Sequence, residues 1–284
     1  MGKFAALMKL TRIEHGFIAA FATSVGCAIG AGGWFGIQPY AVVLAIVVTV
    51  LVEVGLFVFN DICNIEEDRI NAPERPLVKG EISVKEATIV GLLSLILGAS
   101  LALPLGFPPL LVVLLAVSTG LAYDMWLKKA GFIGNLIVAL DTALPFLFGA
   151  TVFSGFSVPI LTFLLAGIAF LAVLGREVLK GIVDIEGDLK AGVRTLAITR
   201  GVNFAAIVSS LLFMLAVSLS LVALPLVTEG RQYLYTFFVA ITDLMFTYVA
   251  GSLLLRRDKS TAAKGRVVTL IAMFTGTLAF AITA

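Results

Sequence analysis

Charged residues are scarce in this sequence. They make up 13% of its 284 residues, whereas about 25% is usual for a soluble globular domain. Hydrophobic residues make up 60%, and the mean hydropathy is +1.09. This composition excludes an ordinary soluble domain and indicates a polytopic membrane protein.

Cysteine and targeting signals are also scarce. Cys27 and Cys63 are the two cysteines, and they fall at opposite ends of the first two apolar segments, so no disulfide framework is expected. The basic start of the chain continues into an ordinary apolar segment, which argues against a cleaved signal peptide. Ala6 stands where N-myristoylation would need Ser or Thr.

Apolar segments of about 20 residues recur along the chain, and each is long enough to cross a hydrocarbon core of about 30 Å. Charge clusters and turns rich in Gly or Pro separate them. The pattern predicts an all-α membrane protein, a single domain over 1–284 with nine transmembrane helices. We expect these helices near 12–31, 40–62, 84–103, 108–124, 131–152, 158–180, 203–226, 232–255 and 264–283.

The basic residues fall almost entirely on one side of this arrangement. All but one of the 20 Lys and Arg residues lie near the N-terminus or near the segments 63–83, 125–130, 181–202 and 256–263; the exception is Arg231. The positive-inside rule makes the basic side cytoplasmic. We therefore expect a multi-pass protein of the cell membrane, with its N-terminus inside and its C-terminus outside.

One cytoplasmic segment begins with the stretch NDICNIEEDRINAPERP at 60–76. Asn60, Asn64 and Asp68 are four residues apart, so they share one face if the second helix continues beyond the membrane. Asp61 flanks this face, and two prolines around Arg75 end the helix.

A second stretch, GREVLKGIVDIEGDLKAGVRTL at 175–196, follows the sixth helix and again spaces two carboxylates, Asp184 and Asp188, by four residues. The second and sixth helices run in the same direction, so both stretches reach the same surface. Oxygen ligands on two such faces suit Mg²⁺, which proteins usually hold with a few carboxylates and with substrate phosphates. Neighbouring Lys and Arg side chains would then bind phosphate oxygens.

Two other interpretations compete with a metal site. Either stretch alone is compatible with an ordinary solvated loop. A transporter would instead place ionisable residues near the membrane midplane. Glu53, Asp141 and Asp243 are the acidic residues deep within predicted spans, whereas most of the others gather at cytoplasmic helix ends. This distribution favours an active site at the membrane surface.

The two stretches resemble the Asp-rich motifs, N-D-x-x-D-x-x-x-D and D-x-x-x-D, of the UbiA superfamily of intramembrane prenyltransferases. The stretch LAYDMWLKKAGFIGN at 121–135 resembles the Tyr-plus-Lys segment of that superfamily, whose architecture also has nine helices. The longer forms of the motifs are most similar to archaeal digeranylgeranylglyceryl phosphate synthases. Asn64 departs from the pattern, because the family has Asp there; Asn offers a metal an oxygen but no charge.

The resemblance implies a reaction. A geranylgeranyl group would pass, with Mg²⁺ as cofactor, from geranylgeranyl diphosphate to geranylgeranylglyceryl phosphate, forming the second ether bond of archaeal membrane lipids. The helices would surround a central cavity open to the cytoplasmic side, and the partners would be these two substrates and membrane lipid, with no nucleic acid and no obligatory protein partner. The alternatives are a sibling enzyme with an aromatic acceptor, such as a quinone, haem or chlorophyll precursor, and a cation-dependent membrane transporter.

The resemblance also divides the candidate residues into three groups. The metal would be held by Asn60, Asn64, Asp68, Asp184 and Asp188. The phosphate groups of the substrates would be bound by Arg75, Lys128, Lys129, Arg176, Lys180 and Arg194. The catalytic group comprises Asp61 and Tyr123, whose ring would favour cationic charge developing on the allylic carbon. Glu53 joins this group because of its position: it lies seven residues before Asn60, two turns along the same helix face, and is a candidate acceptor for the hydroxyl proton.

Overall fold

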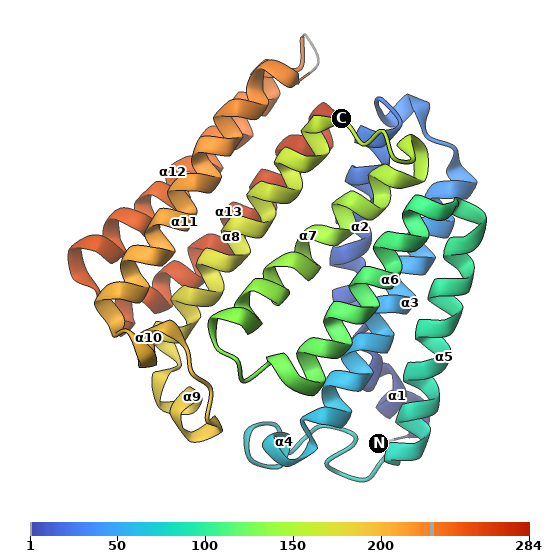
Figure 1. The fold of residues 1–284 in the computed structure, drawn as a ribbon, viewed down its shortest axis with the longest axis vertical. Helices are drawn as coiled ribbons and strands as arrows, with labels where there is room; N and C mark the ends of the chain where they lie inside the picture. Colours follow the sequence, from blue (N-terminus) through green and yellow to red (C-terminus); the bar gives the residue numbers. More distant parts are fainter. Residues whose placement is uncertain (1, 228–229) are drawn as a thin grey trace.

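The computed structural model describes residues 2–227 and 230–284, and these residues form helices and no strands. Nine helical segments among them are long and apolar enough to cross a membrane, as the sequence predicted. They form a single bundle (Figure 1). Its membrane helices are α2 (Ile13–Gly30), α3 (Pro39–Cys63), α5 (Val84–Ala102), α6 (Phe107–Ala122), α7 (Phe132–Ser154), α8 (Ile160–Val183), α11 (Val202–Ala223), α12 (Gln232–Arg256) and α13 (Lys259–Thr283).

The predicted helix bounds agree with the observed ones to within a few residues, except at the last helix. This helix was expected to begin near 264 but begins at Lys259. Asp258 caps it, because its side chain accepts a hydrogen bond of 2.8 Å from the backbone N–H of Thr261. The first turn of α13 is polar, so a search for apolar runs starts the helix too late.

Short helices extend or join the membrane helices, and the sequence analysis did not predict them. Four of them, α1 (Lys3–Thr11), α4 (Ile65–Asn71), α9 (Ile185–Ala191) and α10 (Leu196–Thr199), lie at the end of the bundle that holds the N-terminus (Figure 1). The C-terminus lies at the opposite end (Figure 1), as expected for a chain with an odd number of spans. The others are η1 (Trp34–Gly36), η2 (Leu103–Leu105), the π-helical turn η3 (Tyr123–Leu127) and η4 (Leu224–Leu226).

Close contact between α2 and α7 depends on glycine. Gly26 and Gly30 of α2 lie against the backbone carbonyls of Phe146 and Ala150, and Gly149 of α7 lies against that of Thr23. A Cβ atom at any of these three glycines would overlap a carbonyl oxygen. Small residues spaced by four are the usual means by which membrane helices approach closely, and here they bring the backbones of α2 and α7 into contact.

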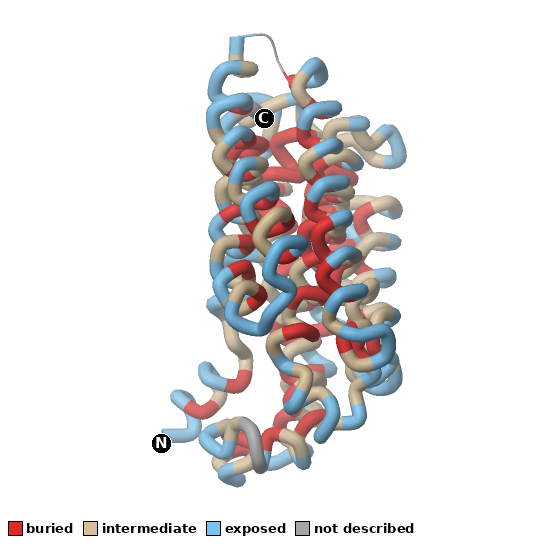
Figure 2. The backbone as a smooth tube through the Cα atoms, turned by 90° about the vertical axis from the view of Figure 1, so that its left-hand side faces the viewer, coloured by how far each residue is buried: buried red, intermediate tan, exposed pale blue. Residues whose placement is uncertain are grey.

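The bundle is covered with apolar side chains. Figure 2 shows buried segments concentrated between the helices and exposed segments along the outside. Many of the exposed residues are large and hydrophobic, such as Leu97, Phe237 and Leu244, which are 50%, 60% and 71% exposed. An apolar exterior of this extent suits contact with lipid rather than water.

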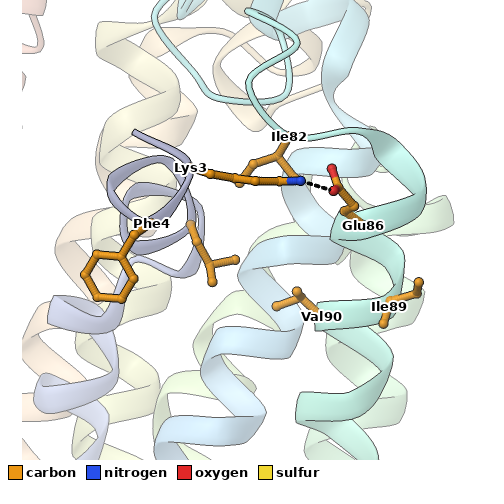
Figure 3. Close-up of a pocket in the computed structure, with 7 residues that line it drawn as sticks. Lys3, Phe4, Ile82, Glu86, Ile89 and Val90 are labelled. Atoms are coloured by element: carbon orange, nitrogen blue, oxygen red, sulfur yellow. Dashed lines mark hydrogen bonds and ion pairs between the residues drawn. The ribbon is translucent and has the colours of Figure 1, made fainter. Parts of the chain in front are cut away.

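The N-terminal helix α1 lies against the start of α5. A groove of about 350 Å³ runs between them, lined mainly by apolar side chains that include Phe4, Ile89 and Val90 (Figure 3). At its rim Lys3 and Glu86 form an exposed ion pair of 2.5 Å, and pairs of this kind contribute little to stability. The better anchors of α1 are Ala6 and Leu10, which are fully buried.

Candidate active site

Both acidic stretches have the same backbone arrangement: a membrane helix, one residue outside helical geometry, and a short helix of seven residues. Asn64 joins α3 to α4 with φ −102° and ψ 9°, and Asp184 joins α8 to α9 with φ −102° and ψ 16°. We call these two sites the first joint and the second joint.

The helical hydrogen-bond pattern continues through both joints. At the first, the backbone N–H of Asn64 donates to the backbone carbonyl of Asn60 at 3.0 Å, and that of Asp68 donates to the backbone carbonyl of Asn64 at 2.8 Å. At the second, the N–H of Asp184 donates to the carbonyl of Lys180 at 3.0 Å and that of Asp188 to Asp184 at 2.9 Å. The spacing of four residues that the sequence predicted is therefore preserved across each joint.

Arg75 joins two carboxylates at the first joint. It forms an ion pair with Asp68 and donates to Asp61 at 2.9 Å. Asp61 is only 2% exposed and also pairs with Arg12. Both guanidinium groups contact the same oxygen of Asp61, Oδ1, so Asp61 can position Arg75.

Arg12 connects the first joint to the N-terminus. It separates α1 from α2 in a left-handed conformation, with φ 43°, which is uncommon for a residue other than glycine. Its guanidinium carbon lies 5.2 Å from the centre of the Phe57 ring, an arrangement that favours the cation. The pairing of Arg12 with Asp61 fixes the start of α2 against the end of α3.

Lys128 and Lys129 reach the first joint from the segment after α6. Lys128 Nζ donates to Asn64 Oδ1 at 2.5 Å and to Glu67 Oε2 at 2.6 Å, and Lys129 lies 3.2 Å from Glu67. Partial burial alone would raise the pKa of Glu67, but the hydrogen bonds and charges of the two lysines outweigh burial and hold that pKa below its ordinary value.

The π-helical turn η3 carries Tyr123 and Asp124 at the end of α6. Turns of this type are frequent at functional sites. The side-chain nitrogen of Asn60 donates to Asp124 Oδ1 at 2.6 Å. Because the nitrogen makes this bond, the side-chain oxygen of Asn60 stays available to a cation.

The second joint is more open. Asp184 is exposed and lies 3.9 Å from Arg266, while Asp188 is half-buried. Partial burial, and next the negative charge of Asp184, raise the pKa of Asp188 above its ordinary value.

Two of the predicted phosphate-binding residues converge on Glu177 of α8. Lys180 Nζ lies 2.9 Å from both carboxylate oxygens of Glu177, and Arg176 lies 3.5 Å from one of them. Nε of Arg176 is buried without a hydrogen-bond partner in the described part of the chain, so this guanidinium can still donate. Arg194 is exposed.

The segment after α6 lies between the two stretches. Lys128 contacts the first joint, while Gly131, with φ 63°, lies against the backbone carbonyl of Arg194 in the second stretch. Both joints are at the same end of the bundle (Figure 1). The predicted metal and phosphate groups are thus carried by neighbouring elements.

The oxygen donors fit a metal ion that substrate helps to hold. Over residues 2–227 and 230–284, no group of three or more His, Cys, Asp and Glu side chains is close enough to hold a metal by itself. Asn64 and Asp68 nevertheless each direct an oxygen at a cationic side chain, Lys128 and Arg75, so both positions favour positive charge. Hard oxygen donors completed by substrate phosphates are the usual Mg²⁺ environment.

The predicted set omits several residues of this network, among them Arg12, Asp124 and Glu177. No spacing in the sequence connects Arg12 with Asp61, which lies 49 positions away. Asp124 had a signal, because it is adjacent to Tyr123, and so did Glu177, which stands between Arg176 and Lys180.

Comparison with known proteins agrees with this geometry. The model of the UbiA prenyltransferase family matches residues 19–280. The chain belongs to the UbiA prenyltransferase family.

Digeranylgeranylglyceryl phosphate synthases are similar to this chain over nearly its whole length. The synthase of Archaeoglobus fulgidus is 36% identical over 277 residues, covering 97% of this chain and 94% of the relative. That of Sulfurisphaera tokodaii is 31% identical, covering 96% and 98%.

Solved structures show the same UbiA fold. A structure of a digeranylgeranylglyceryl phosphate synthase in membranes matches with a TM-score of 0.86 and 31% identity, over 100% of this chain and 99% of that one. A UbiA homologue from Archaeoglobus fulgidus bound to GPP and Mg²⁺ matches with a TM-score of 0.71 and 20% identity, over 97% and 99%. The chain is therefore a multi-pass prenyltransferase with the UbiA architecture.

Proposed function

We propose that this prenyltransferase transfers a geranylgeranyl group from geranylgeranyl diphosphate to geranylgeranylglyceryl phosphate, which forms the second ether bond of archaeal membrane lipids. The observation that carries the proposal is the near full-length similarity to digeranylgeranylglyceryl phosphate synthases. The two acidic joints at one end of the bundle supply the groups that a diphosphate donor requires.

Asn60, Asn64 and Asp68 at the first joint, with Asp184 and Asp188 at the second, hold Mg²⁺ in this proposal. Their hard oxygen donors support the assignment, as does the Mg²⁺ bound together with GPP in a UbiA homologue of the same fold. When bound, Mg²⁺ neutralises the charge that grows on the diphosphate as it leaves.

The basic side chains bind the phosphate groups of the donor and of the acceptor. They are Arg75, Lys128, Lys129, Arg176, Lys180 and Arg194. Five of the six already contact a carboxylate or an amide oxygen. Each of these contacts can be exchanged for a phosphate oxygen, which is a stronger acceptor for Arg and Lys.

Tyr123 lies beside the allylic carbon of the donor in this proposal, where the face of its ring stabilises developing positive charge. Asp61 acts on the donor through Arg75. Its two arginine contacts keep one guanidinium group at the first joint.

The two joints face the cytoplasm. The excess of Lys and Arg at this end of the bundle supports the orientation. The prenyl chains extend from the joints into an apolar cavity among the membrane helices. There, low water content protects an allylic cation from hydrolysis.

A direct assay tests the proposal. Purified full-length protein is incubated with geranylgeranyl diphosphate, Mg²⁺ and a mixture of geranylgeranylglyceryl phosphate with aromatic acceptors, and the products are identified by mass. We expect one product, the diether of the glycerol phosphate, and none after chelation of Mg²⁺ by EDTA. Prenylation of an aromatic ring would retain the diphosphate chemistry and contradict the acceptor. Failure to transfer to any acceptor would contradict the proposed reaction.

A further inference from the structure

Two carboxyl groups face one cavity inside the membrane-spanning part of the bundle. Glu53 of α3 and Asp141 of α7 line a cavity of about 50 Å³ between α3, α6 and α7. Apolar side chains, among them Val52, Leu56 and Phe148, form most of the remaining wall, and the described lining contains no Lys, Arg or His. The cavity is large enough to hold water, since one molecule needs about 10–15 Å³ of such space.

The two carboxyl groups differ in their partners. The hydroxyl of Thr119 on α6 lies 2.5 Å from Asp141 Oδ1 and donates to it. Glu53 is half-buried and has no hydrogen-bond partner in the part of the chain that the structure describes. An ionisable group at membrane depth is costly and usually marks a functional site.

A proline also interrupts the helical hydrogen bonds of α7 beside Asp141. Pro145 lies within α7 four residues after Asp141, and proline has no N–H to donate to the carbonyl of the residue four positions before it. The carbonyl of Asp141 therefore lacks its helical donor. Pro145 itself lines the cavity, so this interruption falls at its wall.

The cavity lies below the proposed diphosphate site. Glu53 precedes Asn60 by seven residues, which is two turns and about 10 Å along α3 on the same face. Thr119 of α6 precedes Tyr123 of η3 by four residues, about one turn. A donor whose diphosphate contacts the joints and whose chain enters the bundle brings its reacting carbon to a level between the joints and the cavity.

Three carboxylates at the first joint are engaged with cations. Asp61, Glu67 and Asp68 each pair with an arginine or a lysine. Glu53 and Asp141 have no such partner. The carboxyl groups of the cavity can therefore take up a proton without giving up a cationic partner.

We infer that Glu53, together with Asp141, accepts the proton that the acceptor hydroxyl releases during prenyl transfer; this inference rests on the proposed function. The oxygen of the hydroxyl forms a bond to C1 of the donor while the bond between C1 and the diphosphate oxygen breaks, and that electron pair leaves with the diphosphate. The O–H bond breaks, and the proton passes to the carboxylate of Glu53. Asp141, oriented by Thr119, shares the proton with Glu53 through the cavity.

The test compares Glu53→Gln and Asp141→Asn with Asp243→Asn in the full-length protein. Asp243 is a matched control, because it also lies in a membrane helix, α12, and accepts a hydrogen bond of 2.7 Å from a hydroxyl, that of Ser220. We expect kcat to fall by about 10²-fold or more in Glu53→Gln, the usual contribution of a general base, with less loss in Asp141→Asn. The KM for the donor and the unfolding temperature should match those of the wild type, and Asp243→Asn should be as active as the wild type.

A pH profile separates proton acceptance from a structural role. The wild-type rate should decline as the acceptor carboxylate is protonated at low pH, and the residual rate of Glu53→Gln should lose this decline. If Glu53→Gln does not fold, Glu53→Asp, which keeps the carboxylate but withdraws it, should show the loss in kcat instead. If both cavity variants are as active as the wild type, this inference is overturned while the proposed function stands. The same holds if Asp243→Asn loses as much activity as Glu53→Gln. An inactive wild type would overturn the proposed function with it.

Discussion

The ammonium group of Lys128 lies 2.5 Å from the side-chain oxygen of Asn64, an oxygen that we propose as a ligand of Mg²⁺. The lysine thus supplies positive charge where the metal is expected. Mg²⁺ alone must displace this ammonium group without offering it a new partner, whereas a diphosphate offers one. The protein should therefore bind the metal more tightly when the donor is present, and the donor more tightly when the metal is present.

Lys128→Met should raise the affinity of the protein for the metal and lower its affinity for the donor. Removal of the competing charge should tighten the binding of Mn²⁺ by several-fold in the absence of donor, and loss of a phosphate contact should weaken the binding of a non-hydrolysable donor analogue about 10-fold. Mn²⁺ binding can be followed by electron paramagnetic resonance and analogue binding by calorimetry. Lys129→Met is the control for Mn²⁺ binding, which it should leave unchanged, because Lys129 contacts Glu67 and not Asn64. Weaker Mn²⁺ binding in Lys128→Met would contradict the competition.

Asp188→Asn should lower kcat by about 10²-fold or more, because it removes charge from the second set of proposed metal ligands. Glu186→Gln on the same short helix is the matched control. Glu186 is exposed and lies 3.8 Å from Lys259, so we expect wild-type activity from this variant. The rates are measured at saturating donor and a range of Mg²⁺ concentrations. Near-normal turnover of a folded Asp188→Asn protein would remove this residue from the metal site.

Asp61→Asn should destabilise the fold and weaken donor binding. The change leaves Arg12 and Arg75 facing an uncharged group at a buried position, and breaking a buried ion pair in this way costs about 3–5 kcal/mol. Denaturant titration in mixed micelles measures the loss, and donor KM should rise because Arg75 is then held by Asp68 alone. Glu66→Gln, which breaks an exposed pair with Arg69, should change neither quantity. A stable Asp61→Asn protein that loses kcat alone would indicate direct participation in catalysis.

Gly149→Ala should separate α2 from α7. The new Cβ atom would overlap the carbonyl oxygen of Thr23, and crowding of this kind typically costs about 1–3 kcal/mol. Gly251→Ala in α12 introduces the same methyl group with nothing within 4 Å, so its unfolding temperature should equal or exceed that of the wild type. An unchanged unfolding temperature in Gly149→Ala would show that the two helices can move apart freely.

Local pattern was sufficient to predict the spans and the two acidic stretches. Apolar length located the nine membrane helices, and a spacing of four placed Asn60, Asn64 and Asp68 along one continuous hydrogen-bonded segment. Contacts between distant segments were not encoded in any spacing. The pairing of Arg12 with Asp61 depends on how α2 packs against α3, and the shared cavity of Glu53 and Asp141 depends on the approach of α7 to α3.

The pairing of charge at the first joint has a kinetic consequence. Four carboxyl-bearing residues there contact or neighbour four cationic ones: Asp61, Glu67, Asp68 and Asp124 with Arg12, Arg75, Lys128 and Lys129. Opposite charges at contact distance cancel over the Debye length of about 8 Å at physiological ionic strength, so this region projects little long-range potential. The first joint therefore selects a diphosphate only once the two are in contact, when the Arg and Lys side chains exchange their carboxylate partners for phosphate oxygens. The association rate of the donor should accordingly depend only weakly on salt concentration.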